Sequence, residues 1–329
     1  MTIVFCCTRD WYIHLYTIIY ALLKHNKVNK IYLFIEDDEI SYLKNDKIEF
    51  INVNSLPEYV KEISPNYNTK YTKMSYLRCY FSKILDEDKI LYLDVDTLVV
   101  DNIDELWKVD LKDNVIAGVH EPGEWNKYLN TYGLDDTYIN SGVLLMDLKE
   151  IREEKLDDSM IYLLNHTKFA FPDQDVINLV CRNRIHQLSN IYNSSETTGI
   201  VDNAKILHYI RGNKGWIKSS PRSDIWYKYF NEMIEKRDNM EKYKVKAIIS
   251  FDDVKVQDEN GKNVKRVANF SEWEVDKERY LYLKQHNAVE LVEIIPNKEC
   301  KKCDECKTEK KTTKKVEEVI KPKKKKSKK

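Results

Sequence analysis

Glycine is scarce in this chain, since only 8 of its 329 residues are glycines. They form neither a G-x-G-x-x-G fingerprint nor a P-loop pattern. Both kinds of nucleotide site need closely spaced glycines, because the backbone must approach the phosphate groups. The sequence therefore argues against a dinucleotide site and against a P-loop site.

Long apolar runs are also absent, and no stretch approaches the ~20 residues that a membrane helix needs. Residues 2–7 read as a strand directly after Met1, where a signal peptide would have a charged and then an apolar region. Four of the seven cysteines lie singly or paired among apolar residues, as is typical of buried thiols in a reducing compartment. We therefore expect a cytoplasmic protein, and 42% hydrophobic residues suffice for a sizeable core.

Charge is balanced over the whole chain but not locally. Lys+Arg and Asp+Glu each number 54, yet residues 301–329 contain 14 lysines and five acidic residues. The preceding residues therefore hold 40 basic and 49 acidic side chains. This acidic body disfavours specific nucleic-acid binding, whereas the basic tail could contact an anionic surface or partner.

The segment 89–100, KILYLDVDTLVV, combines branched and aromatic residues with two aspartates. Such a run is typical of a strand buried on both faces of a parallel sheet. In extended backbone Asp94 and Asp96 would point the same way, while Val95 would turn back into the protein. Two such carboxylates suit Mn²⁺ or Mg²⁺, and the ion would in turn hold a pyrophosphate. The alternative is a solvated aspartate pair that opens a turn.

The order of patterns before and after this segment predicts an α/β fold with an open sheet, whose ligands bind beyond the carboxyl ends of the strands. Strand patterns occupy residues 3–7, 30–35, 49–53, 114–119 and 138–146, and helical patterns occupy 12–25, 72–85, 150–165, 173–182 and 224–234. Residues 120–138 are irregular and aromatic, and they are either a lid over the site or a packed loop.

The order of several short motifs resembles the retaining glycosyltransferases of family 8, which include glycogenin and bacterial lipopolysaccharide galactosyltransferases. The resemblance covers roughly residues 1–235 and rests on CCTRDWY at 6–12, TK at 72–73 through Arg78, LYLDVDTLV at 91–99, NIDEL at 102–106, NSGVLL at 140–145, DQ at 173–174 and HYIRGNKGW at 208–216. One departure is that Arg211 and Gly215 stand where the family usually has glycine and proline.

This resemblance implies a Rossmann-like nucleotide-sugar-binding domain of the GT-A type, with a mixed central sheet and helices on both faces. It implies a metal site of Asp94, Asp96 and His208, and a reacting face with Gln174 and Asp173. It places the UDP-sugar donor against Thr8, Arg9, Tyr12, Lys73, Arg78, Asp94, Val95, Asp96, Asn140, Ser141, Gly212 and Lys214.

Each of these assignments has an ordinary structural alternative. A single histidine such as His208 is often a core residue, although imidazole beside carboxylates also suits Mn²⁺. Lys73 and Arg78 could form a solvated helix face. Asp173 could act only as a negative charge at the positive end of a helix that begins near Pro172.

Three segments are expected along the chain: a glycosyltransferase domain at 1–237, a small β-rich module at 245–295 and a disordered lysine-rich tail at 299–329. The module resembles small β-rich pieces of phage proteins and suggests an attachment role. Cys300, Cys303 and Cys306 offer three thiolates. With His286 they could bind zinc, and without metal they would form a redox-sensitive tail.

From the residues and the resemblance together, we expect a metal-dependent retaining hexosyltransferase. It would move glucose or galactose from UDP-glucose or UDP-galactose to a hydroxyl of a glycan, lipid or protein, with an α-linked product. The alternative is a protein that binds a nucleotide sugar or serves a structural role without turnover. A cytoplasmic, membrane-peripheral or phage-associated location fits either reading.

Overall fold

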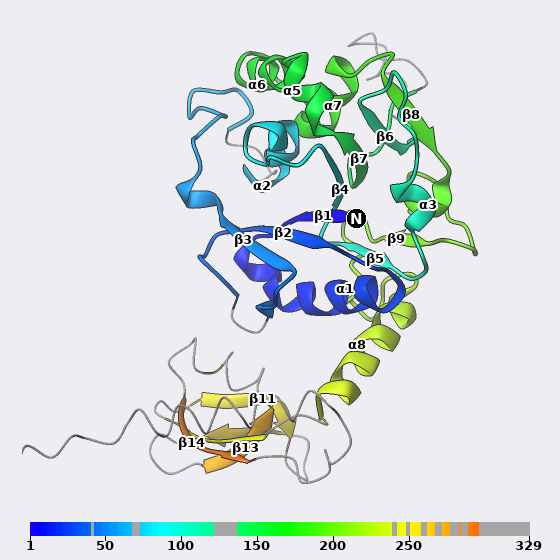
Figure 1. Ribbon diagram of the computed structural model, residues 1–329. Helices are drawn as coiled ribbons and strands as arrows, with labels where there is room; N and C mark the ends of the chain where they lie inside the picture. The colour runs from blue at the N-terminus through cyan, green and yellow to red at the C-terminus, as the bar shows by residue number, and fades with distance from the viewer. Residues whose placement is uncertain are drawn as a thin grey trace, which may run out of the picture. The chain divides into compact units, whose positions relative to one another are not determined.

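The computed structural model describes residues 1–40, 43–67, 73–121, 137–238, 242–247, 251–257, 262–266, 272–276, 283 and 289–295. The chain forms two compact units, Met1–Met233 and Ile234–Lys329. Figure 1 shows the helices and strands of both. Among the described residues, none of the helices is both long enough and apolar enough to cross a membrane.

The first unit is built on a seven-stranded sheet with the order β3-β2-β1-β4-β7-β6-β8. Its strands are β1 (Thr2–Cys6), β2 (Lys30–Ile35), β3 (Ile48–Asn52), β4 (Lys89–Leu93), β6 (Ile116–Val119), β7 (Val143–Asp147) and β8 (Ile185–Leu188). Neighbouring strands are parallel except at β7, which pairs antiparallel with both β4 and β6. The predicted α/β class and mixed sheet are therefore confirmed.

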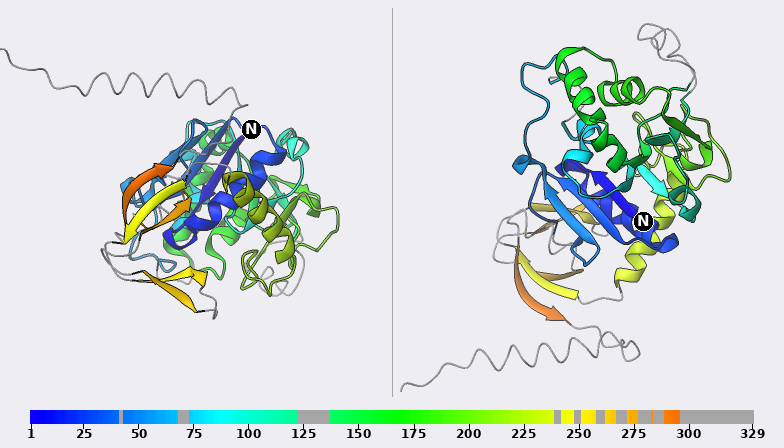
Figure 2. Two further views of the ribbon diagram at one scale, coloured as in Figure 1. Left: turned by 90° about the horizontal axis from the view of Figure 1, so that it is seen from below. Right: turned by 45° about the horizontal axis from the view of Figure 1, so that its top comes forward.

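Helices cover both faces of this sheet. Successive strand residues point to opposite faces, so each strand contributes side chains to two cores. Ile3 and Phe5 pack into one core with α1, whereas Val4 packs into a second core with α6 and α7. Figure 2 shows β1, β2 and β3 running side by side between these layers. The helices are α1 (Tyr12–His25), α2 (Lys73–Tyr76), α3 (Asp104–Trp107), α5 (Leu148–Glu153), α6 (Leu156–His166), α7 (Pro172–Val180) and α8 (Ser223–Asp238), with short 3-10 turns such as η4 (Leu77–Cys79) and η5 (Phe81–Lys83).

The helix predicted over residues 72–85 is wrong in detail, because α2 gives way to the 3-10 turns η4 and η5. Leu77, Arg78 and Cys79 are consecutive and all buried. The 3-10 turn brings successive side chains round by about 120° each, so the chain here follows a tighter path than the α-helix that the pattern predicted. Arg78 is carried into the interior by this irregular path.

The single strand predicted at residues 89–100 is also interrupted. It ends as β4 at Leu93, turns at Val95 and Asp96, and resumes as β5 (Thr97–Val99). The N–H of Thr97 donates to the carbonyl of Asp94 over 3.0 Å, and the Thr97 hydroxyl donates to the same oxygen over 2.7 Å. The aspartates therefore approach each other across a turn and not along an extended strand. Val95 packs against the core, as expected, and also lines the cavity described below.

Strand β5 pairs with β9 (Ile206–His208) as a separate two-stranded antiparallel sheet. Neither β8 nor β9 was predicted, because segments of three or four residues are too short for a periodic pattern. Residues 138–142 form a bridge and turn instead of the strand expected there, and the helix expected at 150–165 divides into α5 and α6. The break lies at Lys155, whose φ is +57°.

The second unit contains β10 (Lys242–Ala247), β11 (Phe251–Gln257), β12 (Asn263–Arg266), β13 (Glu272–Asp276) and β14 (Val289–Ile295). Strands β13, β10 and β14 form an antiparallel sheet, and β11 pairs with β12. The aromatic segment at 122–136 and the tail at 299–329, including its three cysteines, lie outside the described residues.

Candidate active site

A cavity of about 840 Å³ opens at the carboxyl ends of β1 and β4. The start of β7 lies at the same edge, because β7 runs antiparallel to β4 and pairs Val143 with Leu93. Side chains from segments far apart in sequence therefore meet here. They come from the turn after β1, the 3-10 turn η4, the β4–β5 turn, residues 140–142, the start of α7 and the loop after β9.

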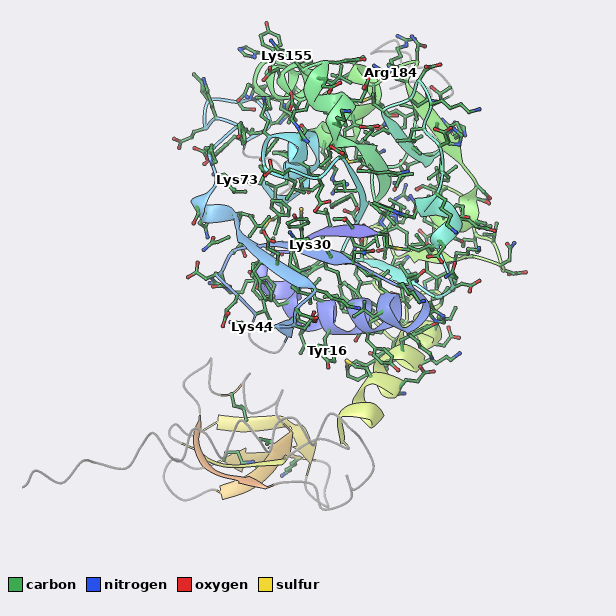
Figure 3. All side chains as sticks on the ribbon, in the orientation of Figure 1. Tyr16, Lys30, Lys44, Lys73, Lys155 and Arg184 are labelled. Atoms are coloured by element: carbon green, nitrogen blue, oxygen red, sulfur yellow. The ribbon has the colours of Figure 1, made fainter. Side chains whose placement is uncertain are left out.

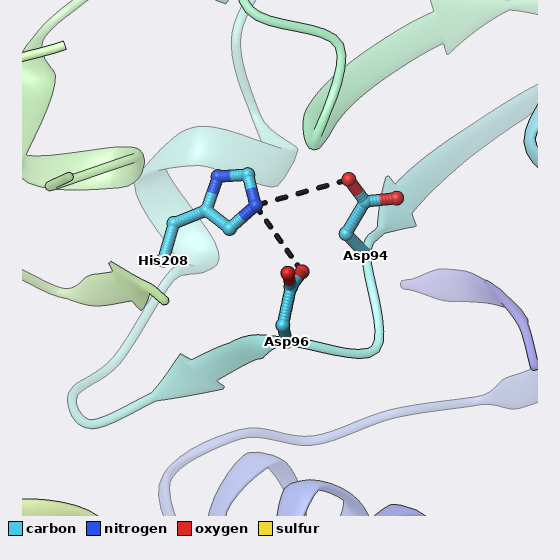
Figure 4. A group of neighbouring side chains, drawn as sticks. All are labelled: Asp94, Asp96 and His208. Atoms are coloured by element: carbon cyan, nitrogen blue, oxygen red, sulfur yellow. Dashed lines mark ion pairs between the residues drawn. The ribbon is translucent and has the colours of Figure 1, made fainter. Parts of the chain in front are cut away.

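Asp94, Asp96 and His208 converge on one wall of the cavity (Figure 4). One ligand atom from each lies within 4.8 Å of the others. His208 Nε2 is 3.2 Å from Asp96 Oδ1 and 3.8 Å from Asp94 Oδ2. Imidazole nitrogen and carboxylate oxygen form a donor set suited to Mn²⁺.

Backbone pairing brings His208 to the aspartates. In the β5–β9 ladder Thr97 lies opposite His208, and the N–H of Tyr209 donates to the carbonyl of Asp96 over 2.9 Å. The imidazole is 4% exposed. Its position is therefore set by main-chain hydrogen bonds and not by a mobile loop.

Gly142 provides a test of whether this group could hold an ion. A Cβ at Gly142 would lie 2.2 Å from His208 Cε1 and 2.9 Å from Asp94 Oδ2. Real Cβ atoms do not approach that closely, so any side chain at this position would displace two of the three candidate ligands. Only glycine leaves room at this position for His208 and Asp94 to approach each other. The residues present therefore fit a divalent cation.

Arg78 is buried and holds Asp94 in place. Its Nη2 donates to Asp94 Oδ1 over 2.8 Å, its Nε lies 3.2 Å from Asp173 Oδ2, and its Nη1 donates to the hydroxyl of Ser141 over 2.9 Å. The hydroxyl of Tyr92 also donates to Asp94 Oδ1. Burial alone would lower the pKa of Arg78, but Asp94, Tyr92 and Asp173 outweigh it and raise the pKa, so the guanidinium stays charged.

Asp96 is held from the other side by Lys214. Lys214 Nζ lies 2.5 Å from Asp96 Oδ2 and 5.1 Å from the ring of Trp11. Burial would raise the pKa of Asp96, but the charges and hydrogen bonds of His208 and Lys214 outweigh it and hold the pKa below its usual range. Asp96 is therefore a carboxylate across the physiological pH range.

The amide of Gln174 has a defined orientation on the opposite wall. The N–H of Ser141, which can only donate, lies 2.9 Å from Gln174 Oε1. Gln174 Nε2 donates to Glu121 Oε2 over 2.6 Å and to the hydroxyl of Tyr138 over 3.0 Å. Burial raises the pKa of Tyr138, as does its neighbour Asp175, so this hydroxyl stays protonated and accepts from Gln174 while donating to Asp175.

Asp173 lies between the two walls, at the start of α7. It is 5% exposed, and one carboxylate oxygen is shared by Arg78 Nε and the hydroxyl of Ser141. Burial raises the pKa of Asp173, although Arg78 acts against the shift. Asp173 therefore does more than place a charge at the helix terminus.

Most of the predicted site residues line the cavity: Thr8, Arg78, Asp94, Val95, Asp96, Asn140, Ser141, Asp173, Gln174, His208 and Lys214. The other four do not. Arg9 pairs with Asp37 at the surface, Lys73 pairs with Glu58 (Figure 3), and the hydroxyl of Tyr12 accepts from the N–H of Glu36. A Cβ at Gly212 would meet no atom within 4 Å.

The cavity also contains residues that sequence reasoning did not assign. Trp11 lines it beside Thr8, and Glu121 lines it although it was counted only within an irregular segment. Arg211 lines it with a φ of +57°, a left-handed conformation that favours glycine. The glycine that the resemblance places at this position was the available signal for that conformation.

Comparison with known proteins identifies the family of this chain. A family model described as glycosyl transferase family 8 matches residues 2–220. A putative glycosyltransferase of Haemophilus influenzae is 28% identical over 161 residues, which are 44% of this chain and 49% of the relative. General stress protein A of Bacillus subtilis is 24% identical over 213 residues, which are 56% of this chain and 72% of that protein. The match to the Haemophilus protein therefore spans about half of that relative.

Solved structures show the same fold. The galactosyltransferase LgtC, crystallised with donor and acceptor sugar analogues, superposes with a TM-score of 0.58 at 20% identity, covering 70% of this chain and 96% of LgtC. Glycosyltransferase GlyE of Streptococcus pneumoniae superposes with a TM-score of 0.54 at 20% identity, covering 72% of this chain and 63% of GlyE. At this level of identity both comparisons show a shared fold. They do not assign a role to any residue of this chain.

Proposed function

The chain belongs to glycosyl transferase family 8, and on that premise we propose that it is a metal-dependent retaining glycosyltransferase. It transfers a hexose, glucose or galactose, from a UDP-sugar to a hydroxyl of a glycan, lipid or protein. The product is α-linked. The observation that carries the proposal is the convergence of Asp94, Asp96 and His208 on a cavity that also holds buried Arg78 and Lys214.

This combination suits a diphosphate leaving group. Mn²⁺ or Mg²⁺, when bound by the two aspartates and His208, would offset the negative charge that develops on the departing UDP. Lys214 and Arg78 add fixed positive charge beside that position. A neutral or cationic ligand would gain nothing from so many cations around two carboxylates.

The rest of the donor would lie along the cavity walls. Thr8 and Trp11 line the cavity at the turn after β1, and the Trp11 ring offers a flat surface for the nucleotide base. Val95 lies between the two metal-binding aspartates and would contact the nucleotide. Asp173 and Ser141 would accept hydrogen bonds from the sugar hydroxyls. Arg9, Tyr12, Lys73 and Gly212 remain predicted donor contacts that would require a different local arrangement from the one described.

The reaction breaks the bond between the anomeric carbon and the phosphate oxygen of UDP and forms a bond from that carbon to the acceptor oxygen. We propose that the acceptor attacks from the face that UDP leaves, and that its proton passes to the departing phosphate oxygen. This balance needs no covalent nucleophile on the protein. Asp173 is committed to Arg78 and Ser141, which makes it a positioning group in this proposal.

Gln174 would stabilise positive charge at the anomeric carbon through Oε1. That oxygen accepts the main-chain N–H of Ser141 and has one further lone pair. The hydroxyl of Ser141 lies 3.3 Å from both Gln174 Oε1 and Asp173 Oδ2, and a carboxylate is the stronger acceptor. When the Ser141 proton goes to Asp173, the second lone pair of Gln174 is available to the sugar.

Release of UDP from a panel of UDP-sugars, measured with and without added Mn²⁺, tests this function. We expect metal-dependent release from UDP-glucose or UDP-galactose, and none from an Asp94→Asn/Asp96→Asn variant. Tight binding of UDP without turnover of any donor would instead favour the non-catalytic alternative. Acceptors can then be compared with the productive donor.

A further inference from the structure

Two asparagine side chains are buried between the reacting wall of the cavity and His208. Asn193 is fully buried, and Asn140 is 7% exposed. Asn193 Nδ2 lies 2.9 Å from Asn140 Oδ1, and Asn193 Oδ1 lies 2.9 Å from His208 Nδ1. Asn193 therefore touches the imidazole on the side opposite the aspartates.

The location of Asn193 follows from main-chain pairing. The N–H of Ser194 donates to the carbonyl of Ile206 over 2.9 Å, and the N–H of His208 donates to the carbonyl of Ser194 over 3.0 Å. Asn193 thus sits beside β9 with its side chain at the level of His208. Its position, like that of His208, does not depend on a mobile loop.

The directions of these hydrogen bonds follow from one backbone group. The N–H of Gly142, which can only donate, lies 2.9 Å from Asn140, so the Asn140 atom facing it must be the oxygen. That oxygen also faces Asn193, so the Asn193 atom facing it must be the nitrogen. The remaining Asn193 atom is the oxygen, and it can only accept.

The same directions say what the imidazole of His208 does when a cation is bound. The ring nitrogen that faces Asp96 Oδ1 and Asp94 Oδ2 is Nε2, and its lone pair would be directed at a cation between the two aspartates. Nδ1 then carries the hydrogen of the ring and donates it to Asn193 Oδ1, which only accepts.

We propose that Asn193 is a positioning residue for His208. It holds the plane of the ring by accepting the hydrogen of Nδ1, while Asn140, anchored by the N–H of Gly142, fixes the amide of Asn193. Its value for metal binding rests on the proposed function. Partners of this kind commonly change metal affinity by about 10- to 100-fold when they are lost.

The hydrogen bond can be read from the Nδ1–H signal of His208 by NMR of the full-length chain loaded with Mg²⁺, which is diamagnetic. We expect a hydrogen on Nδ1 that exchanges slowly with water, because Asn193 Oδ1 accepts it, and none on Nε2. A hydrogen on Nε2, or an Nδ1 hydrogen that exchanges as fast as that of an exposed imidazole, would overturn the proposal. This measurement needs no variant.

Mn²⁺ affinity, measured by titration calorimetry, tests the second part. Asn193→Leu removes the acceptor at similar size and should weaken binding by about 10- to 100-fold. Asn66→Leu is the matched control. Asn66 is equally buried and donates to the carbonyls of Leu164 and Thr167, so its loss should lower stability without changing Mn²⁺ affinity.

Equal Mn²⁺ affinity of Asn193→Leu and the parent would contradict the proposal. A parent chain that binds neither Mn²⁺ nor Mg²⁺ would instead contradict the proposed function, and this inference with it. If Asn193→Leu does not fold, the Nδ1 hydrogen of the Mg²⁺-loaded parent still decides the question.

Discussion

The two walls of the cavity are built by different means. The metal wall is formed by Asp94, Asp96, His208, Arg78 and Lys214, and ion pairs of the two aspartates with Arg78 and Lys214 hold it. The amide wall, formed by Asn140, Ser141, Gln174, Tyr138 and Glu121, is held mainly by hydrogen bonds of neutral groups. A charge acts over distance and in most directions, whereas an amide acts only where its oxygen or nitrogen points.

This difference implies that the walls fail in different ways. Damage to the metal wall should appear first as lost affinity for the ion and for the donor's diphosphate. Damage to the amide wall should leave those affinities largely intact and lower the rate of the chemical step. The following five changes test that separation, beginning with the largest expected effect.

Replacing both metal-wall aspartates should abolish most activity. Asp94→Asn/Asp96→Asn removes two negative ligands, so Mn²⁺ affinity should fall and UDP release should drop by at least about 100-fold. Because Asp94 also pairs with buried Arg78, some loss of stability should accompany the double change and be smaller in Asp96→Asn alone. Calorimetry and a UDP-release assay measure the first effect, and thermal unfolding measures the second. A fully active double variant would end the enzyme proposal.

Removing the amide that faces the sugar should slow transfer without stopping it. Gln174→Ala loses electrostatic help at the anomeric carbon but no obligatory intermediate, so we expect a decrease in kcat of roughly 10- to 100-fold with Mn²⁺ affinity unchanged. Product analysis by NMR should still show an α linkage. A glycosyl adduct trapped on Asp173 or Gln174 in mass spectrometry, or a β-linked product, would refute same-face substitution.

Adding one carbon at Gly142 should damage the metal wall although Gly142 bears no ligand. The new Cβ would collide with His208 and Asp94, so Gly142→Ala should weaken Mn²⁺ binding by roughly tenfold or more. Gly212→Ala is the control, since a Cβ there meets no atom within 4 Å. Unchanged affinity of Gly142→Ala would show that the three candidate ligands do not act together.

Loosening the orientation of Gln174 should have a smaller effect than removing it. In Glu121→Gln the partner of Gln174 Nε2 loses its charge and can donate as well as accept, so one of the hydrogen bonds that hold the amide becomes weaker, while the N–H of Ser141 still sets its direction. One net hydrogen bond contributes about 0.5–1.5 kcal/mol, which corresponds to a two- to tenfold lower kcat. Steady-state kinetics should show this with little change in KM for the donor. A fall in Mn²⁺ affinity in this variant would instead show that the amide wall also determines metal binding.

Removing everything after about Arg237 should have the smallest effect on catalysis. All residues of both walls belong to Met1–Met233, and charges in the tail are screened within ~8 Å at physiological salt. A chain that ends there should therefore retain UDP-sugar hydrolysis, and it should lose any binding to an acidic partner or surface that depends on the basic tail. Loss of hydrolysis by a folded truncated chain would show that the C-terminal residues complete the site.

Much of this arrangement could be predicted from sequence because its signals are local. Buried strands β1, β2 and β4 are runs of apolar residues, and the start of α7 is marked by Pro172 and the acidic residues after it. The convergence of Asp94 and Asp96 was expected from a pleated strand, yet a turn produces it. The prediction that Asp94 and Asp96 converge is still correct, because a pleated strand and this turn both bring the side chains of residues i and i+2 close together.

What sequence reasoning could not supply depends on contacts across long stretches of chain. Trp11 and Tyr12 are adjacent aromatics, and only packing decides that Trp11 lines the cavity while Tyr12 is buried against Glu36. Glu121 and Asn193 are ordinary polar residues by composition. Their roles depend on hydrogen-bond directions that exist only once Gln174 and His208 are in place.

The β5–β9 pairing has a consequence for how the molecule is made. Its ladder joins Thr97 to His208 across more than a hundred residues of intervening chain, so closing this loop is entropically expensive and must follow more local folding. A nascent chain that has exposed Asp94 and Asp96 to the outside of the ribosome still lacks the third ligand. The complete set of three candidate ligands therefore forms only after nearly the whole first unit has been synthesised. Until then the two aspartates do not compete for cellular cations.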